Sequence, residues 1–424
     1  MWKAQCKLGF ADWLLHGLLA WRARTWCVVS TPLREFRRMV SLPPVSPLDV
    51  QPPVRLASLD ALRGMAILAI IGFDGAVAAF AELAQSGPAL FRDICGFLAT
   101  QFSHAEWDGL NLYDFVFPLF IFITGTGIAF ALPRTLAAQS RREVFKRILW
   151  RTLLMYALGV IYYGGLGQAW GEIRYVGVLQ RIAICYFVTS LLFMHLRPAA
   201  QAFVAMAILF AYWLLMTFVP APGIPAGALG PVANLADWID RAYLPGRLWF
   251  GDRDPEGLLS TLPAIATCIL GALAGVLLQE KFEPTRINWA LILVGLAGMI
   301  TGSVWGLSFP IIKALWTSSF VLVTAGACAI LLGVMHELMD VRRKIKAIWL
   351  VWIGMNAITL YMISGFGFFD VIAWRLVGGD FGAMLNQMSG AGTSASAFAT
   401  HAVALTIAIG LAGFLYRKRV FIRL

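Results

Sequence analysis

Long apolar runs alternate with short polar segments along the chain from about residue 57 onward. A helix needs roughly 20 apolar residues to cross a bilayer. Ten segments approach or exceed that length: 57–81, 112–133, 146–164, 175–196, 199–219, 258–279, 287–306, 315–337, 347–366 and 402–417. The pattern therefore predicts an all-α polytopic membrane protein with about ten transmembrane helices. Segment 146–164 fits the pattern least well, because its tyrosines are mixed with glycines.

Basic residues are distributed unevenly between the two sets of connecting segments. Seventeen Lys and Arg residues flank or fill the segments on one side, as at 342–346, against seven on the other side. Cytoplasmic loops carry the excess of positive charge in membrane proteins. We therefore expect both ends of the helical unit, the N- and C-termini, in the cytoplasm, and the long segments 82–111, 220–257 and 367–401 outside.

Composition supports this class of protein and argues against two others. Hydrophobic residues make up 59% of the 424 residues and charged residues only 13%, whereas a soluble domain has about 25% charged residues. The net charge of +11 lies mainly in the connecting segments, so topology explains it better than nucleic-acid binding. The six cysteines lack CxxC spacing and three lie in apolar runs, so we interpret those three as small buried hydrophobic residues.

Residues 1–54 differ in character from the rest of the chain. They are basic, they end in the proline-rich stretch SLPPVSPLDVQPP, and their apolar segment 9–21 is too short to span a bilayer. We expect a flexible cytoplasmic extension here, with an interfacial helix over 9–21 as the alternative, followed by the membrane unit at 55–424.

Polar side chains within the apolar segments are candidates for a functional cavity, because burying them in a bilayer is costly. Asp60 and Arg63 lie three residues apart and share a helix face. Asp74 lies in the same segment, near its predicted external end. Three more such side chains lie in later segments: Gln180, Arg181 and Asn356. The alternative interpretation is a structural pair with an interfacial anchor for Asp60 and Arg63, and a simple loop-facing position for Asp74. For the three later side chains it is hydrogen bonding across helices.

His104 is the histidine whose surroundings most favour catalysis. It lies at the predicted external mouth of the second segment, and carboxylates follow it at Glu106, Asp108 and Asp114. A histidine near carboxylates can act as a general base or a nucleophile; a structural role at the membrane boundary is the alternative. A zinc site is disfavoured because His104 is the only nitrogen ligand in the cluster, so no metal is expected.

Two sequence blocks resemble the heparan-α-glucosaminide N-acetyltransferase family, which comprises the lysosomal enzyme and bacterial relatives. They are RLASLDALRGMAIL at 55–68 and HAEWDGLNLYDFVFPLFIFITG at 104–125, and shorter matches follow in the same order to about residue 365. The resemblance implies a membrane enzyme that transfers an acetyl group from cytoplasmic acetyl-CoA to a glucosamine amine on the other side. The family's active-site histidine matches His104, and Asp74 stands where the lysosomal enzyme has Asn.

The resemblance and the polar pattern together suggest a role for each candidate. The residues expected to be catalytic are His104, Asp74 and Asp114, with His104 as base or acetyl carrier. The residues expected to bind acetyl-CoA are Asp60, Arg63, Gln180, Arg181 and Asn356. The residues expected to bind the acceptor are Glu106, Trp107, Asp108, Asp254 and Glu256. The expected partners are the lipid bilayer of a bacterial inner membrane and a glycan or amino-sugar acceptor, with a homodimer left open and no nucleic acid.

Two other functions remain open on the sequence alone. A transporter or channel for a sugar or a lipid-linked glycan would use the same polar cavity, although the chain has no convincing internal repeat of the kind found in many transporters. An O-acyltransferase of surface glycans would share the chemistry but modify a hydroxyl group. The identity of the acceptor is not determined by the residues.

Overall fold

The computed structural model describes residues 55–390 and 392–422, so the expectations for residues 1–54 lie outside the described residues. Within the described ranges the regular structure is helical, with isolated β-bridges and no strands. The α-helices are α2 (Ala57–Leu68), α3 (Asp74–Leu83), α4 (Ala89–Gln101), α5 (Val116–Ala138), α6 (Arg141–Tyr162), α7 (Val178–His195), α8 (Pro198–Phe218), α9 (Leu235–Tyr243), α10 (Thr261–Leu278), α11 (Pro284–Gly306), α12 (Ser318–His336), α13 (Ile348–Met355), α14 (Ala357–Gly365), α15 (Phe368–Val377), α16 (Gly379–Ser389) and α17 (Ser394–Arg417).

Eight helical segments in the described ranges are long and apolar enough to cross a membrane, or nine if the bent pair α13–α14 counts as one span. They correspond to nine of the ten predicted segments. The remaining segment, 146–164, falls on α6, a 22-residue helix whose first half is rich in Arg and Lys and which is not among those spans. The all-α polytopic fold is thus confirmed, but the prediction of ten spans exceeds what length and composition support.

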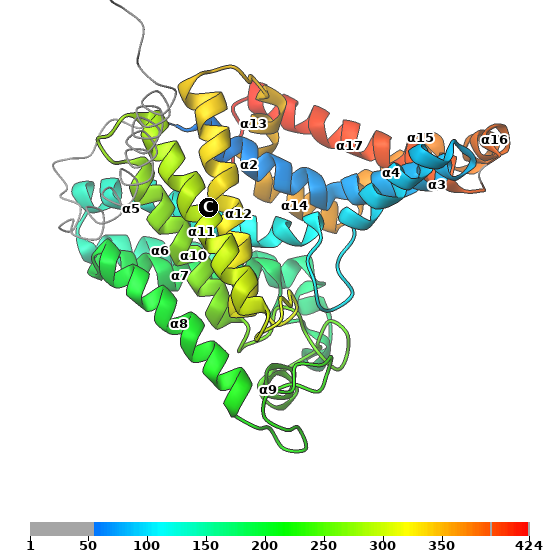
Figure 1. The fold of residues 1–424 in the computed structure, drawn as a ribbon. Coiled ribbons are helices and arrows are strands. Elements are labelled where there is room, and N and C mark those ends of the chain that lie inside the picture. Colours follow the sequence, from blue (N-terminus) through cyan, green and yellow to red (C-terminus); the bar gives the residue numbers. More distant parts are fainter. Residues whose placement is uncertain (1–54, 391, 423–424) are drawn as a thin grey trace, which may run out of the picture.

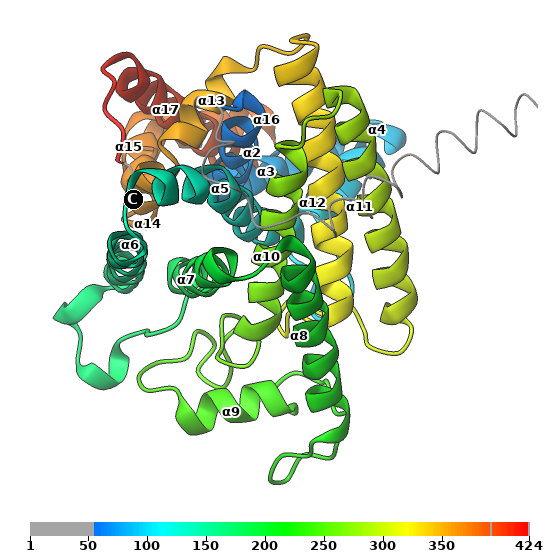
Figure 2. The same ribbon diagram turned by 90° about the vertical axis from the view of Figure 1, so that its left-hand side faces the viewer.

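The helices form two groups that diverge from one another in Figure 1. Helices α8, α10, α11 and α12 lie side by side, whereas α2, α3 and α17 run toward α4, α15 and α16. Helix α10 is the most buried of these spans, because 83% of its residues are buried inside the structure. It contacts α5, α7, α8 and α12, which lie around it in Figure 2. The core of the molecule is therefore centred on α10.

Glycines allow α5 and α10 to approach one another backbone to backbone. A Cβ atom at Gly125 of α5 would collide with the Cys268 carbonyl of α10, and one at Gly271 would collide with the Phe122 carbonyl. Small residues permit such close contacts between membrane helices, and the gain is van der Waals packing. This tight pair fixes the position of α5, whose first turn adjoins the candidate catalytic residues.

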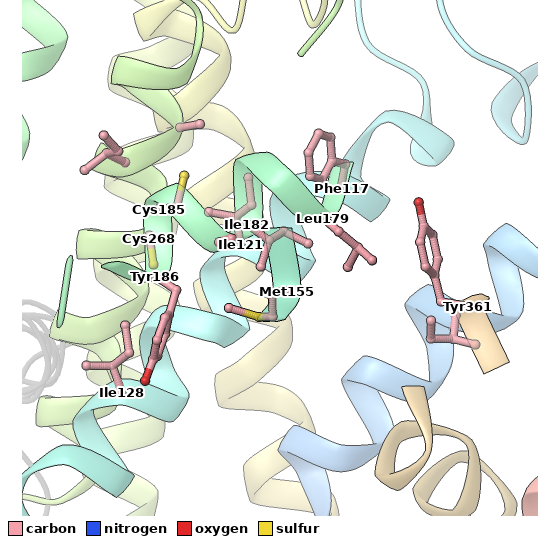
Figure 3. Packing of buried hydrophobic residues seen from close by; sticks show 14 of the residues in the cluster. Phe117, Ile121, Ile128, Met155, Leu179, Ile182, Cys185, Tyr186, Cys268 and Tyr361 are labelled. Carbon is pink, nitrogen blue, oxygen red and sulfur yellow. The ribbon is translucent and has the colours of Figure 1, made fainter. Parts of the chain in front are cut away.

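A buried apolar cluster joins α5, α6, α7, α10 and α14. Figure 3 shows Cys185 and Cys268 within it, next to Ile182. These two cysteines and Cys328 are buried free thiols. The interpretation of the three cysteines as small hydrophobic residues is therefore confirmed.

Two spans are interrupted at or next to candidate residues. The first span passes from α2 to α3 through a π-helical turn (Ala69–Phe73), in which Gly72 has φ 128°. Glycine adopts that conformation without steric cost, and π-turns are frequent at functional sites. The pair α13–α14 bends by 70° at Asn356. Asp74 and Asn356 therefore lie at irregular backbone and not within straight helices.

The three long segments predicted to lie outside contain helices of their own. Segment 82–111 contains α4, segment 220–257 contains α9, and segment 367–401 contains α15, α16 and the start of α17. The last span therefore begins at Ser394, eight residues before the predicted start. The small residues SASA at 394–397 continue the helix instead of forming a loop.

Candidate active site

The loop between α4 and α5 carries His104 and a carboxylate partner. Asp114 lies in the 3-10 turn Leu112–Phe115, and its side chain is fully buried. The Nδ1 atom of His104 lies 2.8 Å from Asp114 Oδ1, while the His104 side chain remains 55% exposed. A buried carboxylate of this kind fixes the tautomer and orientation of an imidazole. The structure thus brings together two of the three residues expected to be catalytic.

Asp114 accepts hydrogen bonds from three further groups. The backbone amides of Ala105 and Asn111 donate to its Oδ2 atom at 3.2 Å and 3.0 Å. Lys313 Nζ donates to Oδ1 at 3.1 Å. Lys313 was not singled out by the sequence analysis, although it lies between the predicted spans 287–306 and 315–337 and is the only lysine on the side predicted to be external. A single lysine on that side was the feature of the sequence that could have marked Lys313 as a candidate.

Asp74 reaches the site through a tyrosine. It is the first residue of α3, directly after the π-helical turn. Its carboxylate interacts with the Tyr113 hydroxyl, and the Tyr113 ring centroid lies 4.6 Å from that of His104. The third residue expected to be catalytic therefore contacts His104 indirectly, by holding the ring beside it.

Three of the residues expected to bind the acceptor lie in the His104 loop. Glu106 and Asp108 are exposed. Trp107 is half-buried, and its Nε1 atom donates to the Leu229 carbonyl at 2.9 Å. The guanidinium of Arg253 lies 5.6 Å from the Trp107 ring. The His104 loop and the segments around α9 therefore border the same open side of the molecule.

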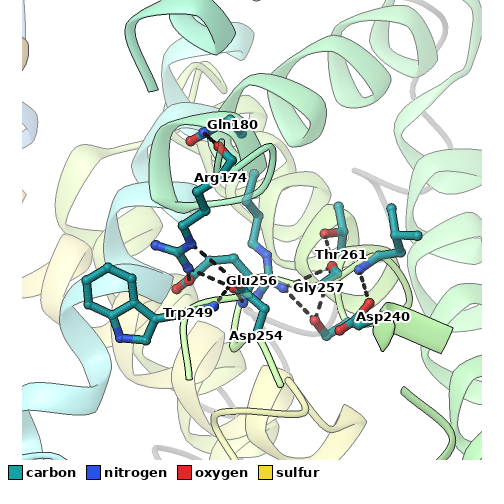
Figure 4. Close-up of polar contacts among 11 residues, drawn as sticks. Arg174, Gln180, Asp240, Trp249, Asp254, Glu256, Gly257 and Thr261 are labelled. Carbon is teal, nitrogen blue, oxygen red and sulfur yellow. Dashed lines mark hydrogen bonds and ion pairs between the residues drawn. The ribbon is translucent and has the colours of Figure 1, made fainter. Parts of the chain in front are cut away.

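The other two, Asp254 and Glu256, hold a buried arginine (Figure 4). The Nη2 atom of Arg174 lies 2.7 Å from Asp254 Oδ1 and 2.6 Å from Glu256 Oε2. The rings of Tyr163 and Trp249 cover its guanidinium at 4.3 Å and 4.5 Å. Burial opposes the charge of Arg174, but the two carboxylates outweigh it and raise its pKa. Burial also raises the pKa of Glu256, against the charge of Arg174.

Three of the five residues expected at acetyl-CoA are buried between helices. Gln180 and Asn356 each donate to a backbone carbonyl, at 3.4 Å and 3.0 Å. Arg181 donates to Ser260 Oγ at 2.5 Å, and its guanidinium lies 5.0 Å from the Trp316 ring. Their immediate neighbours in sequence line the cavity described next, but these three side chains do not.

A cavity of about 790 Å³ lies between α2, α5, α6, α7 and the pair α13–α14. Asp60 and Arg63, the other two residues expected at acetyl-CoA, line it. Asp60 pairs with Arg55 at 2.6 Å and with Arg63 at 3.1 Å. Arg147 and Arg151 also line the cavity. Four guanidinium groups against one carboxylate provide the chemistry that binds phosphate groups.

Tyrosines separate this cavity from His104. Beyond its basic end, the cavity is lined mainly by aliphatic side chains and reaches Tyr361. Tyr361 stacks on Tyr162 at 4.5 Å, and Tyr162 lies near Tyr113, the ring beside His104. His104 itself is not among the lining residues. A chain of tyrosine rings thus connects the end of the cavity with His104.

Comparisons with known proteins agree with an acyl-transfer site. The sequence model of an acyltransferase domain family matches residues 56–415. Heparan-alpha-glucosaminide N-acetyltransferase of Mus musculus is 27% identical over 377 residues, which cover 74% of this chain and 55% of the mouse protein. The Homo sapiens protein is 27% identical over 383 residues, covering 74% and 54%. The chain thus spans about half the length of the curated relatives it matches.

Proposed function

Because the chain belongs to the acyltransferase domain family and is a relative of heparan-alpha-glucosaminide N-acetyltransferase, we propose that it transfers an acetyl group from cytoplasmic acetyl-CoA to an amino sugar or glycan outside. The proposal rests mainly on one observation: a candidate catalytic pair and a candidate donor-binding cavity both adjoin helix α5. The His104–Asp114 pair lies just before this helix, and the arginine-lined cavity extends toward its other end.

The cavity suits a donor with clustered negative charge and a long, slim arm. Arg55, Arg63, Arg147 and Arg151 would bind the phosphates of CoA. The aliphatic walls would accommodate the pantetheine arm, and Tyr361 lies where the thioester would approach the site. Such a volume is within the range of about 300–1,000 Å³ that small-molecule sites occupy.

His104 performs the chemistry in this proposal. When its Nδ1–H donates to Asp114, its Nε2 atom carries the free lone pair. That nitrogen takes the proton of the acceptor amine during attack on the thioester, or it accepts the acetyl group and passes it on. Asp114 stabilises the cationic imidazole in both routes. The products are the N-acetylated acceptor and the free thiol of CoA.

The open side of the site supports a polar acceptor. Glu106 and Asp108 present exposed carboxylates close to His104 in the same loop, and these would attract the ammonium form of an amino sugar. The Trp107 ring, already held by Leu229 and Arg253, offers a face for a sugar ring. Recognition of the acceptor and binding of the donor would then use different loops.

The test is His104→Ala in purified protein, with labelled acetyl-CoA as donor and glucosamine as acceptor. Loss of the base should reduce transfer by about 10²–10⁴-fold, while acetyl-CoA binding persists because its contacts lie along the cavity. His195→Ala is the matched control, since His195 is exposed at the far end of α7. It should retain full transfer.

Three outcomes would contradict the proposal. Undiminished transfer in His104→Ala would exclude His104 as the catalytic group. Uptake of sugar into proteoliposomes without acetyl-CoA, and no acetylated product with it, would favour the transporter. Modification of a hydroxyl group and not of the amine would favour the O-acyltransferase.

A further inference from the structure

Lys313 places a primary amine against the histidine of the site. Its Nζ atom lies 2.7 Å from His104 Nδ1, 3.3 Å from His104 Nε2 and 3.1 Å from Asp114 Oδ1. In the proposed reaction His104 Nε2 takes the proton of the acceptor amine, so that amine has to lie within reach of this nitrogen, as Lys313 Nζ does at 3.3 Å. The protein therefore carries its own amine where an acceptor amine would bind.

The backbone holds Lys313 in place from two directions. Ile312 forms an antiparallel bridge with Asp108, and the neighbouring Ile311 carbonyl accepts a hydrogen bond from Gly109 at 3.0 Å. These contacts tie the lysine segment to the His104 loop. On the other side, the amide of Trp316 donates to the Lys313 carbonyl at 2.9 Å.

Trp316 closes that turn in a strained conformation. Its φ is 52°, in the left-handed region that non-glycine residues rarely adopt. The side chain is fully buried, and its Nε1 atom donates to Thr267 Oγ1 at 3.2 Å. Strain of this kind persists where the surrounding structure enforces it, and it is common at functional sites. The position of Lys313 is thus a fixed feature of the fold.

Burial makes the neutral amine of Lys313 easier to form than that of an exposed lysine. Burial lowers the pKa of Lys313, although the charges of Asp114 and Glu256 oppose this shift. Only a neutral amine has the lone pair needed to attack a carbonyl carbon. The Lys313 side chain is 22% exposed, so it is open to a reagent that reaches His104.

We propose that Lys313 is an internal acetyl acceptor, which is acetylated at the His104 site when no outside acceptor is bound. This inference rests on the proposed acetyl transfer. The Lys313 ammonium first loses one proton to solvent, and the amine then attacks the thioester carbonyl. The carbon–sulfur bond breaks, an amide bond forms at Nζ, and the second proton passes through His104 to the departing thiolate. The products are acetyl-lysine and the free thiol of CoA, with no change in oxidation state.

Acetylation of Lys313 changes the site in two ways. It removes the positive charge that contacts Asp114, and it adds an acetyl group beside both ring nitrogens of His104. Both changes hinder the next transfer. The enzyme is therefore expected to lose activity progressively when it meets acetyl-CoA without an acceptor.

The test is a labelling experiment on the purified full-length protein. The protein is incubated with isotopically labelled acetyl-CoA, with and without glucosamine, and acetylated lysines are identified by peptide mass spectrometry. Lys344 and Lys346 report chemical background, because both are exposed and follow the C-terminal end of α12, whereas Lys313 precedes its N-terminal end. Without glucosamine, label at Lys313 should exceed that background by on the order of 10²-fold, the contribution of a positioned base. Glucosamine should reduce it.

Two variants separate the catalysed reaction from chemical labelling. In His104→Ala, label at Lys313 should fall to the level of Lys344. Lys313→Arg keeps a positive charge but has no nucleophilic amine. Whatever activity this variant has should therefore stay constant during incubation with acetyl-CoA, whereas the activity of the protein without substitutions should decline. The mass-spectrometric result on the protein without substitutions remains valid even if either variant folds poorly.

The outcomes distinguish this inference from the proposed function. Acetylated glucosamine together with unlabelled Lys313 overturns the inference and leaves the proposed function in place. Labelled Lys313 without acetylated glucosamine supports the inference and overturns the choice of acceptor. No label on either amine overturns both.

Discussion

Asp114 is the residue on which most polar contacts of the site converge. It accepts from the His104 ring, the Lys313 ammonium and two backbone amides, and it is fully buried. A buried carboxylate is costly unless hydrogen bonds compensate its lost hydration, and these four donors provide that compensation. Asp74 is only half-buried and acts on Tyr113. The two carboxylates therefore contribute unequally to the geometry at His104.

Replacement of the two carboxylates tests this inequality. In Asp114→Asn the neutral amide no longer stabilises a cationic imidazole, so kcat/KM for acetyl transfer should fall by about 10²–10⁴-fold. In Asp74→Asn the amide can still hold the Tyr113 hydroxyl, so the loss should be smaller. Steady-state kinetics on the two purified variants decide the order. A larger loss in Asp74→Asn would show that Asp74 is the principal partner of His104.

The π-helical turn and α17 form the element that positions Asp74. His401 of α17 packs against this turn, and a Cβ atom at Gly75 would lie only 2.6 Å from the His401 ring. Gly72, in the turn itself, has the positive φ that lets the chain bend. The orientation of the Asp74 side chain therefore depends on the absence of a Cβ atom at Gly75, which makes room for the His401 ring.

A rescue experiment tests that dependence. Gly75→Ala should force His401 and the turn apart, at a cost of about 1–3 kcal/mol for overpacking, and should reduce transfer by displacing Asp74. The double variant Gly75→Ala/His401→Ala restores the space, so it should recover most of the activity. Activity and thermal unfolding are measured on both proteins. An equal loss in the double variant would mean that His401 does not determine the position of Asp74.

Helix α9 is joined to the turn before α10 by Asp240. Asp240 Oδ1 accepts from the Leu258 amide at 2.8 Å, and a Cβ atom at Gly257 would collide with the same carboxyl group. Burial raises the pKa of Asp240 to about 7; Asp237 and Asp254 also raise it, and Arg181 and the Leu258 amide oppose. The folded protein thus holds this proton at a pH where the unfolded chain has released it.

The raised pKa of Asp240 makes the stability of the folded protein depend on pH in a predictable direction. Because the pKa of Asp240 is raised on folding, its contribution to stability is complete below the unfolded pKa of about 4 and is lost as pH rises through about 7. The unfolding temperature should therefore fall between about pH 5 and about pH 8. Asp240→Asn keeps an acceptor for Leu258 without titrating, so the decrease should be smaller. Identical pH profiles would show that Asp240 is not protonated in the folded state.

At the scale of the whole molecule, the two candidate sites lie in different regions of one bundle. The basic end of the cavity adjoins the start of α2, whose Ala57 and Ser58 amides donate to Asp340 after α12. The His104 loop adjoins the segments around α9. Transfer of an acetyl group across a membrane requires that these two regions face opposite aqueous compartments.

Thiol labelling in intact cells tests this orientation. Ser86 is exposed after α3, and the cysteines of the described ranges are buried. A Ser86→Cys variant whose Cys6 and Cys27 are replaced by Ser should react with a membrane-impermeant reagent added outside, because the positive-inside rule places this segment there. A reporter fused after Leu424 should read as cytoplasmic. Labelling of Ser86→Cys only after permeabilisation would reverse the orientation.

The pattern of residues along the chain was enough to predict the class of fold and the position of the candidate histidine, His104. Apolar runs of membrane-spanning length indicate spans regardless of how they pack, because each helix satisfies its own backbone hydrogen bonds. The same local logic predicted the buried cysteines and placed His104 near carboxylates in one short loop. It was less exact at 146–164, where the helix α6 forms but its basic first half keeps it from the apolar spans, and at the start of α17, which begins eight residues before the predicted start.

The packing of the helices determines which side chains meet. Lys313 lies 209 residues from His104 and Arg174 lies 80 residues from Asp254, so no local pattern could pair them. The arginine-lined cavity likewise combines residues from six regions of the chain, and the candidates Gln180, Arg181 and Asn356 fall just outside its wall. Such contacts arise from helix packing, which shape and close glycine contacts determine. The sequence reveals which polar residues a membrane helix carries, but only the packed bundle determines the partner that each one finds.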